Sequence, residues 1–193
     1  DLELERFQVF VGPNGAGKTT LLDIPIVLGE MLAARSIEKA FFEQTPSHVR
    51  PRADYAGDLI HKHLGNSFII AVEARLPESI IAELVEKQAN RLEKRRAKDG
   101  GRAVDALRTH RERWLTRIRY EIEFELFNDA LQIAQEYLLL LTEGANVKKR
   151  TPSGLVGEWI PKRSRQSRSV IRRPRGGKVV FLPEAEMHGP RNG

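Results

Sequence analysis

The apolar and polar positions of this 193-residue chain change their period several times along its length. Alternating apolar residues predict a strand over residues 6–11, and apolar residues at helical spacing predict a helix over about 17–35, with Pro25 inside it. A weaker amphipathic stretch follows near 37–42, and the apolar run at 68–72 predicts a second strand. The first part of the chain therefore predicts a strand, a helix and another strand.

Residues 78–118 have few apolar side chains among many charges, and these side chains follow helical spacing in two runs. The segment KRRAKDGG, residues 94–101, separates the runs. We therefore predict two antiparallel helices joined by a Gly-Gly turn, either as a projecting coiled hairpin or as an ordinary surface pair.

The segment YEIEFEL, residues 120–126, alternates apolar residues with glutamates and predicts a half-buried strand. Glu121, Glu123 and Glu125 would share its solvated face, because no His or Asp accompanies them at the spacing of a metal site. An amphipathic helix is predicted over 128–141. Residues 169–182 predict a β-hairpin with its turn at 174–177.

The composition, 40% apolar and 30% charged, is that of a soluble globular protein, and no apolar stretch is long enough to span a membrane. Cysteine is absent, which excludes disulfides and thiolate metal sites and is compatible with a reducing, cytoplasmic location. We expect a cytoplasmic protein with no membrane partner.

Positive charge is concentrated near the C-terminus. Residues 146–193 carry 12 Lys and Arg against 3 Asp and Glu, whereas residues 1–145 carry 20 against 23. Eleven of these basic residues lie between 148 and 178, beside one acid, Glu158. Such a density is typical of a nucleic-acid partner. The alternatives are a solvated loop or a contact with an acidic protein surface.

Residues 12–19 read GPNGAGKT and match the phosphate-binding pattern G-x-x-x-x-G-K-[ST], between a predicted strand and a predicted helix. Glycine lets the backbone N–H groups approach phosphate closely. Lys18 would reach the β- and γ-phosphates, and the Thr19 hydroxyl would be a Mg²⁺ ligand. The pattern predicts ATP and Mg²⁺ as cofactors, with these binding residues: Asn14, Gly15, Ala16, Gly17, Lys18, Thr19 and Thr20.

The segment VGPNGAGKTTLLD, with its short lead-in ELERFQVF, resembles the N-terminal lobe of ABC-type ATPases, most closely the RecF, SMC and OLD-like AAA-ATPase branch. The resemblance implies an α/β fold: a P-loop NTPase lobe with a mixed β-sheet, a Walker A helix, a helical hairpin insertion at 78–118 and a basic β-hairpin. We predict an ATP-binding lobe over 1–145. Residues 146–193 are then a basic segment and hairpin, within that lobe or appended to it.

The resemblance also implies a hydrolase in which ATP closes two heads of a homodimer, coupled to DNA or an effector protein in DNA repair or anti-phage defence. Three family elements are not found: the LSGGQ-like signature, the Walker B strand with its catalytic glutamate, and a switch histidine. The nearest Walker B match is VVFLPE, residues 179–184, where Pro183 replaces the metal aspartate. Gln44, Gln132 and Gln135 are candidates for the glutamine that touches Mg²⁺. We expect a piece of a longer protein that binds ATP but is incomplete for hydrolysis.

Three other functions remain open at this point. GPNGAGKTTLL also suits the ATPase subunit of an ABC transporter. The chain could be a nucleic-acid-binding module whose phosphate loop is degenerate. A nucleoside or small-molecule kinase is the least supported, because no lid arginines or substrate pocket can be placed.

Overall fold

The computed structural model describes residue 4 and residues 8–33, 37–47, 49–60, 64–95, 100–145, 166–176 and 180–181. The chain forms two compact units. Unit 1 consists of residues 1–66 and 126–132, and unit 2 consists of residues 67–125 and 133–193.

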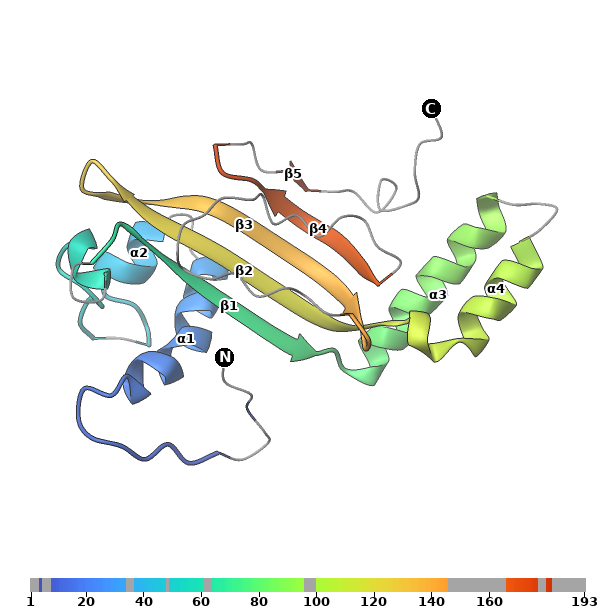
Figure 1. Ribbon diagram of the computed structural model, residues 1–193, viewed down its shortest axis with the longest axis horizontal. Coiled ribbons are helices and arrows are strands. Elements are labelled where there is room, and N and C mark those ends of the chain that lie inside the picture. Colours follow the sequence, from blue (N-terminus) through green and yellow to red (C-terminus); the bar gives the residue numbers. More distant parts are fainter. Residues whose placement is uncertain are drawn as a thin grey trace. The chain divides into compact units, whose positions relative to one another are not determined.

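Unit 1 contains two α-helices and a 3₁₀ turn. Helix α1 spans Lys18–Ala33, α2 spans Ile37–Phe42, and the 3₁₀ turn η1 spans Ala56–Leu59 (Figure 1). The helix predicted over about 17–35 is confirmed as α1, which continues through Pro25, and the weaker amphipathic stretch near 37–42 forms the short helix α2. The helices and the segment around η1 bury a small apolar core: Val27, Ala40, Phe41, Ala53, Ala56 and Ile60.

The predicted strand at 6–11 is wrong for its described part, because residues 8–13 adopt no regular secondary structure. The alternating apolar residues there are exposed, with Val9 at 70% and Val11 at 91%. A strand needs a neighbouring strand to pair its backbone groups, and none pairs with this segment in the part of the chain that the structure describes.

The strands form an antiparallel sheet in the order β1-β2-β3-β4-β5 (Figure 1). The four long strands are β1 (Ser67–Arg75), β2 (Leu115–Phe127), β3 (Ala130–Thr142) and β4 (Ser167–Arg173), and β5 adds Val180–Phe181. The strands predicted at 68–72 and 120–126 are confirmed, as is the pairing of the predicted C-terminal hairpin. Because the described pairs are antiparallel, the predicted mixed sheet is corrected to an antiparallel one.

A helical hairpin links β1 to β2 in unit 2. Helix α3 spans Glu78–Arg95 and α4 spans Gly100–Thr109, followed by the 3₁₀ turn η3 at Arg111–Arg113. The two helices pack through an apolar cluster of their own: Ile81, Val85, Ala89, Val104 and Leu107. The predicted pair of helices is therefore confirmed, but the predicted Gly-Gly turn is wrong, because Gly100 and Gly101 are the first two residues of α4.

The second predicted helix ends earlier than the expected residue 118. Trp114 leaves the helix and donates its indole N–H to the Leu107 carbonyl oxygen at 2.8 Å. Ile118 already pairs with Ala74 of β1. Strand pairing of residues 115–118 therefore overrides their helical spacing.

The predicted amphipathic helix at 128–141 is wrong, because this segment is strand β3. Asn128 and Asp129 adopt left-handed backbone conformations, with φ of 51° and 59°. A two-residue turn of this kind matches the twist of two antiparallel strands. The turn folds β3 back beside β2, and pairing with β2 and β4 satisfies its backbone groups.

The predicted solvated face of β2 is also wrong. Glu121 is only 4% exposed and Glu123 only 7%. Arg119 pairs with Glu121 at 3.0 Å, Arg175 pairs with Glu123 at 2.6 Å, and Arg175 also contacts Glu125. Buried carboxylates require such partners. Among the described residues, no group of three or more His, Asp and Glu is arranged to hold a metal ion.

The predicted α/β class holds at the level of mixed helices and strands, whereas the P-loop NTPase lobe and the domain division at residue 145 stay predictions. Within the described ranges, no helix has the length and apolar character needed to cross a membrane.

Candidate functional site

The glycine-rich segment 12–17 leads into α1 through an unusual backbone path. Gly15 and Gly17 have φ of +80° and +82°, conformations that residues with a Cβ rarely adopt. The N–H of Ala16 donates to the Pro13 carbonyl oxygen at 3.3 Å and closes the turn. Helix α1 then begins at Lys18. The two glycines thus turn the loop directly into the helix.

Lys18 lies across this loop. Its ammonium group donates hydrogen bonds to the carbonyl oxygens of Gly12 and Pro13, both at 2.7 Å. An ammonium group has three N–H donors. Within the described residues two are used, so a third is available for an oxygen of an anion held above the loop.

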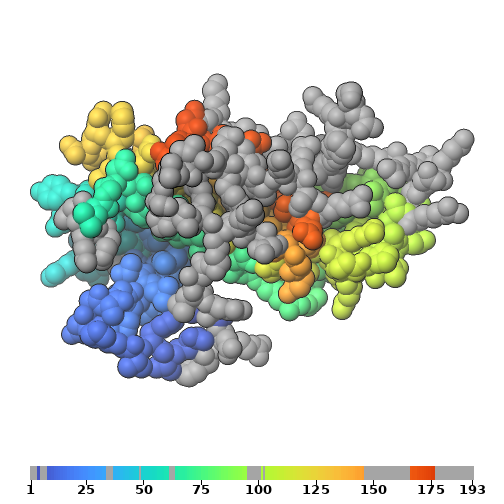
Figure 2. Space-filling view, in the orientation of Figure 1, coloured from blue at the N-terminus to red at the C-terminus, as the bar shows by residue number. Residues whose placement is uncertain are grey.

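The first turn of α1 adds to the positive character of the loop. Thr19 and Thr20 are exposed there, and the first N–H groups of a helix have no acceptor within the helix. These N–H groups and the helix dipole favour an anion. In the space-filling view, blue atoms of the N-terminal segment are visible at the surface (Figure 2). The predicted residues Asn14, Gly15, Ala16, Gly17, Lys18, Thr19 and Thr20 lie together in this segment.

Replacing Gly17 by alanine tests whether the backbone conformation matters for binding. An added Cβ would meet no atom within 4 Å, so the change introduces backbone strain without a clash. Left-handed conformations cost about 1–2 kcal/mol in other residues, which corresponds to an expected loss of nucleotide affinity of about 5- to 30-fold. Calorimetric titration with ATP measures it. Gly29→Ala is the matched control, because Gly29 lies within α1, also has open space at its Cβ, and has no left-handed φ.

A buried arginine joins α1 to α2 in unit 1. Arg52, whose side chain is 8% exposed, donates to both carboxylate oxygens of Asp23, at 2.6 and 2.8 Å. It also donates to Glu30 at 2.5 Å and to the Ala40 carbonyl oxygen of α2 at 2.6 Å. Asp23 and Glu30 are two turns apart on α1, so one guanidinium joins two turns of α1 to α2.

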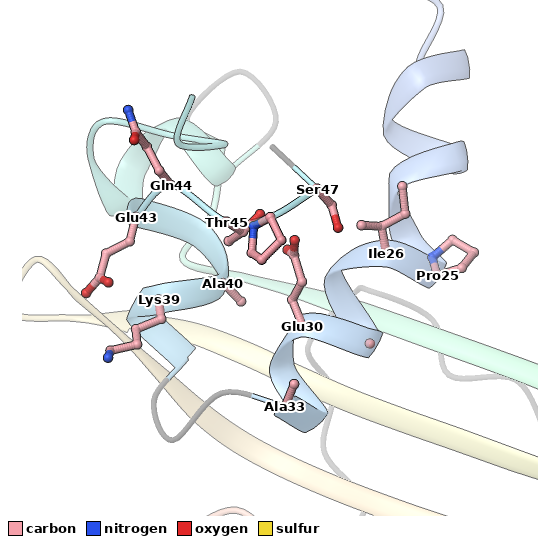
Figure 3. A pocket seen from close by; sticks show the side chains of 12 residues that line it. Pro25, Ile26, Glu30, Ala33, Lys39, Ala40, Glu43, Gln44, Thr45 and Ser47 are labelled. Atoms are coloured by element: carbon pink, nitrogen blue, oxygen red, sulfur yellow. The ribbon is translucent and has the colours of Figure 1, made fainter. Parts of the chain in front are cut away.

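The Glu30 carboxylate is held in its charged form. Desolvation alone would raise its pKa, but hydrogen bonds from Thr45, Arg52 and Ser47 and the Arg52 charge lower that pKa below its ordinary value. The Glu30 side chain points toward Thr45 and Ser47 (Figure 3). Hydrogen bonding to Asp23 in turn raises the pKa of Arg52. The three groups therefore form a network of opposite charges, which we call the Arg52 clamp: Asp23, Glu30 and Arg52.

An open pocket of 570 Å³ lies beside the clamp, between α1 and α2. Figure 3 shows its lining: Pro25, Ile26, Gly29, Glu30, Ala33, Lys39, Ala40, Glu43, Gln44, Thr45, Pro46 and Ser47. Pro25 is seven residues beyond Lys18, or about 10 Å along a helix. The pocket is therefore separate from the glycine-rich loop.

The glutamine candidates are dispersed. Gln44 lines the pocket. Gln132 is exposed on β3, whereas Gln135 is buried, donates to Glu123 at 3.0 Å and accepts from Tyr137. Of the Walker B candidate at 179–184, only β5 is described. Much of the basic segment at 148–178 also lies outside the described residues, apart from 166–176.

Sequence reasoning missed the Arg52 clamp. Asp23 and Glu30 share a helix face, but Arg52 is 29 residues away from Asp23 in a turn-rich stretch. No local pattern distinguishes it from the other arginines of the chain. Only the fold brings these charges together.

Comparison with known proteins adds no information about this site. No protein-family model, no curated protein and no solved structure matches this chain.

Proposed function

We propose that this chain binds ATP and Mg²⁺ through residues 12–20. It would be the N-terminal part of an ABC-type ATPase of the RecF, SMC and OLD-like branch. ATP-driven closure of two heads in a homodimer would be coupled to nucleic acid or to an effector protein, in DNA repair or anti-phage defence.

The observation that carries this proposal is the geometry of the glycine-rich loop. Two left-handed glycines turn the loop into the start of α1, and the Lys18 ammonium lies over the carbonyl oxygens of Gly12 and Pro13. Backbone N–H groups, a helix N-terminus and a lysine are the groups that bind the phosphates of a nucleoside triphosphate. The GKT sequence supports ATP or another triphosphate over a small anion.

Thr19 fits the proposed magnesium site in chemical type. Its hydroxyl is an oxygen ligand, which Mg²⁺ prefers, and it lies on the exposed first turn of α1. Mg²⁺ usually takes few protein ligands beside phosphates and water. It would neutralise charge on the phosphates. Phosphoryl transfer also requires a group that orients the attacking water. Because no such carboxylate was identified in the sequence, we expect binding with little turnover by this chain alone.

Calorimetric titration of the chain with ATP, with and without Mg²⁺, tests the proposal. We expect Mg²⁺ to strengthen binding in the wild type. Thr19→Val should bind ATP without Mg²⁺ about as well as the wild type but lose the strengthening, because the hydroxyl is removed while the side-chain volume is kept.

Thr19→Ser is the matched control, since serine also occupies this position of the motif. It should retain the effect of Mg²⁺. Equal Mg²⁺ dependence in the valine variant and the wild type would contradict the assignment of Thr19. A hydrolysis assay on the same samples should give negligible phosphate release, and rapid release would show that the chain is complete for catalysis.

A further inference from the structure

The open pocket between α1 and α2 has mostly apolar walls. Ile26 and Ala33 of α1 line it, together with Ala40 of α2 and Pro46 from the segment that follows α2 (Figure 3). Its volume of 570 Å³ lies within the range of about 300–1,000 Å³ that is typical of small-molecule sites. All of its lining residues belong to unit 1. The pocket can therefore hold the apolar body of a small molecule.

One partly buried carboxylate, that of Glu30, lies in the wall of this pocket. The side chain is 13% exposed, and its Oε2 atom accepts a hydrogen bond from Arg52 at 2.5 Å. The Oε1 atom is buried and has no hydrogen-bond partner in the part of the chain that the structure describes. Thr45 and Ser47 stabilise the charged form of this carboxylate without donating to Oε1. One carboxylate oxygen in the pocket wall thus lacks a donor.

Arg52 has little capacity left for this oxygen. Its guanidinium already donates to both carboxylate oxygens of Asp23, to Glu30 Oε2 and to the Ala40 carbonyl oxygen. An arginine side chain has five N–H donors, so these bonds engage at least four of them. Because a buried acceptor without a donor is unfavourable, and a charged one more so, Glu30 is suited to a donor from a bound molecule.

The other charged groups of the pocket lie at its outer edge. Lys39 and Glu43 line the pocket, but both residues are exposed and their side chains point away from Glu30 (Figure 3). Their charges are opposite and cancel in sum. A bound molecule would therefore meet the negative charge of Glu30 between apolar walls. A metal ion is less suited, because no group of three or more acids and histidines gathers in the described ranges.

We propose that this pocket binds a small organic cation, an amine with an apolar body, whose ammonium group pairs with Glu30. The apolar body would pack against Ile26, Ala33 and Pro46. A charged N–H donor forms stronger hydrogen bonds to a carboxylate than a neutral donor does. An anionic head group would be repelled. The proposed ATP site is not required, because the pocket is separate from the glycine-rich loop.

Titration of the isotope-labelled full chain with phenylbutylamine, followed by the amide chemical shifts of residues 25–47, tests this site. Phenylbutanol carries the same apolar body with a neutral head group, and phenylbutyrate carries an anionic one. The amine should bind about 10-fold more tightly than the alcohol, as expected for a charge-assisted hydrogen bond. Phenylbutyrate should bind more weakly than the alcohol.

Glu30→Gln removes the charge and keeps the size of the side chain. It should weaken binding of phenylbutylamine about 10-fold, to the affinity of phenylbutanol, and should change the affinity of phenylbutanol less than 2-fold. Glu30 also belongs to the Arg52 clamp, so circular dichroism and thermal melting must show that the variant folds. If it does not fold, a second variant that blocks the pocket decides the question.

Gly29→Phe is that second variant. A Cβ at Gly29 would meet no atom within 4 Å, so the new ring extends from open space into the pocket. All three compounds should lose at least 10-fold in affinity. Leu32→Phe is the matched control, because it places the same ring on α1 at a position that is 84% exposed and outside the pocket lining. It should change the affinities less than 2-fold.

Equal affinity of the wild type for phenylbutylamine and phenylbutanol would overturn the assignment to a cation. Wild-type affinity in a folded Gly29→Phe variant would place the binding elsewhere and overturn the site itself. Absence of saturable binding of phenylbutylamine to the wild type would contradict both.

Failure of this site and failure of the ATP site remain distinguishable. Gly29→Phe should keep wild-type ATP affinity, and Lys18→Ala should keep wild-type affinity for phenylbutylamine in the absence of nucleotide. Loss of amine binding in a folded Lys18→Ala variant would contradict the independence of the two sites.

Discussion

Lys18→Ala is expected to weaken ATP binding about 10- to 100-fold, the effect of losing a hydrogen bond from a charged donor. In the protein the ammonium lies 2.7 Å from the carbonyl oxygens of Gly12 and Pro13, above the turn made by the two left-handed glycines. A phosphate bound there would gain both its charge and its remaining N–H donor. Alanine removes both. Calorimetry with Mg·ATP at fixed ionic strength measures the loss.

Lys39→Ala is the matched control for charge. Lys39 belongs to α2 in the same unit, is exposed and lines the separate pocket. Its removal should change ATP affinity less than 2-fold, because an exposed charge at a distance is screened by salt. Full ATP affinity in a folded Lys18→Ala variant would contradict the proposed phosphate site. Equal losses in both variants would indicate a nonspecific effect of net charge.

Arg52→Met is expected to lower the free energy of unfolding of unit 1 by about 3 kcal/mol, the lower end of the cost of breaking a buried ion pair, since it leaves two partly buried carboxylates without their cation. Methionine keeps much of the apolar stem but removes the donors to Asp23, Glu30 and the Ala40 carbonyl oxygen. Hydrogen exchange measured by mass spectrometry on peptides covering 18–33 and 37–60 reports this unit directly. Arg50→Met, at an exposed neighbouring position, should leave exchange nearly unchanged.

The stability of Arg52→Met relative to the wild type should change with pH in a predictable direction. In the wild type the folded pKa of Glu30 is lowered below its ordinary value of 4.5. Its contribution to stability is therefore present above about pH 4.5 and is lost as the pH falls through the folded pKa. In Arg52→Met, two partly buried carboxylates lack the cation, so their pKa values should rise.

The variant should therefore become more stable relative to wild type as the pH falls from 7 to 5. Exchange protection of unit 1 measured over this range checks the prediction. If the difference between variant and wild type is the same at both pH values, the clamp acts through packing instead of charge.

The features that could be read from sequence are those specified by neighbouring residues. The loop at 12–17 depends on glycines and a lysine within one turn, so its left-handed positions and its junction with α1 follow from local chemistry. The same holds for the helices α1 and α3 and for the strand at 120–126, where a regular period extends over enough residues to indicate the type of element.

The segment at 128–141 shows where local information fails. Its leucines at 138–141 are continuous, so their spacing suits a helix or a strand buried on both faces. The Asn128–Asp129 turn was the overlooked local signal, because these residue types tolerate left-handed conformations. Two adjacent strands then satisfied the backbone groups of β3, and tertiary pairing decided its structure.

The charged residues show most clearly what local sequence specifies and what tertiary contacts decide. The alternation in β2 placed Glu121 and Glu123 on one face, but whether that face meets water depended on Arg119 and on Arg175, which lies about fifty residues further along the chain. The Arg52 clamp likewise joins positions 22 and 29 residues apart. A buried charge is stable only where the fold places an opposite charge or a hydrogen-bonding group beside it. Sequence by itself determined the glycine-rich loop and the direction of side chains along each strand, whereas the tertiary structure decided which of those side chains are buried and with which partner.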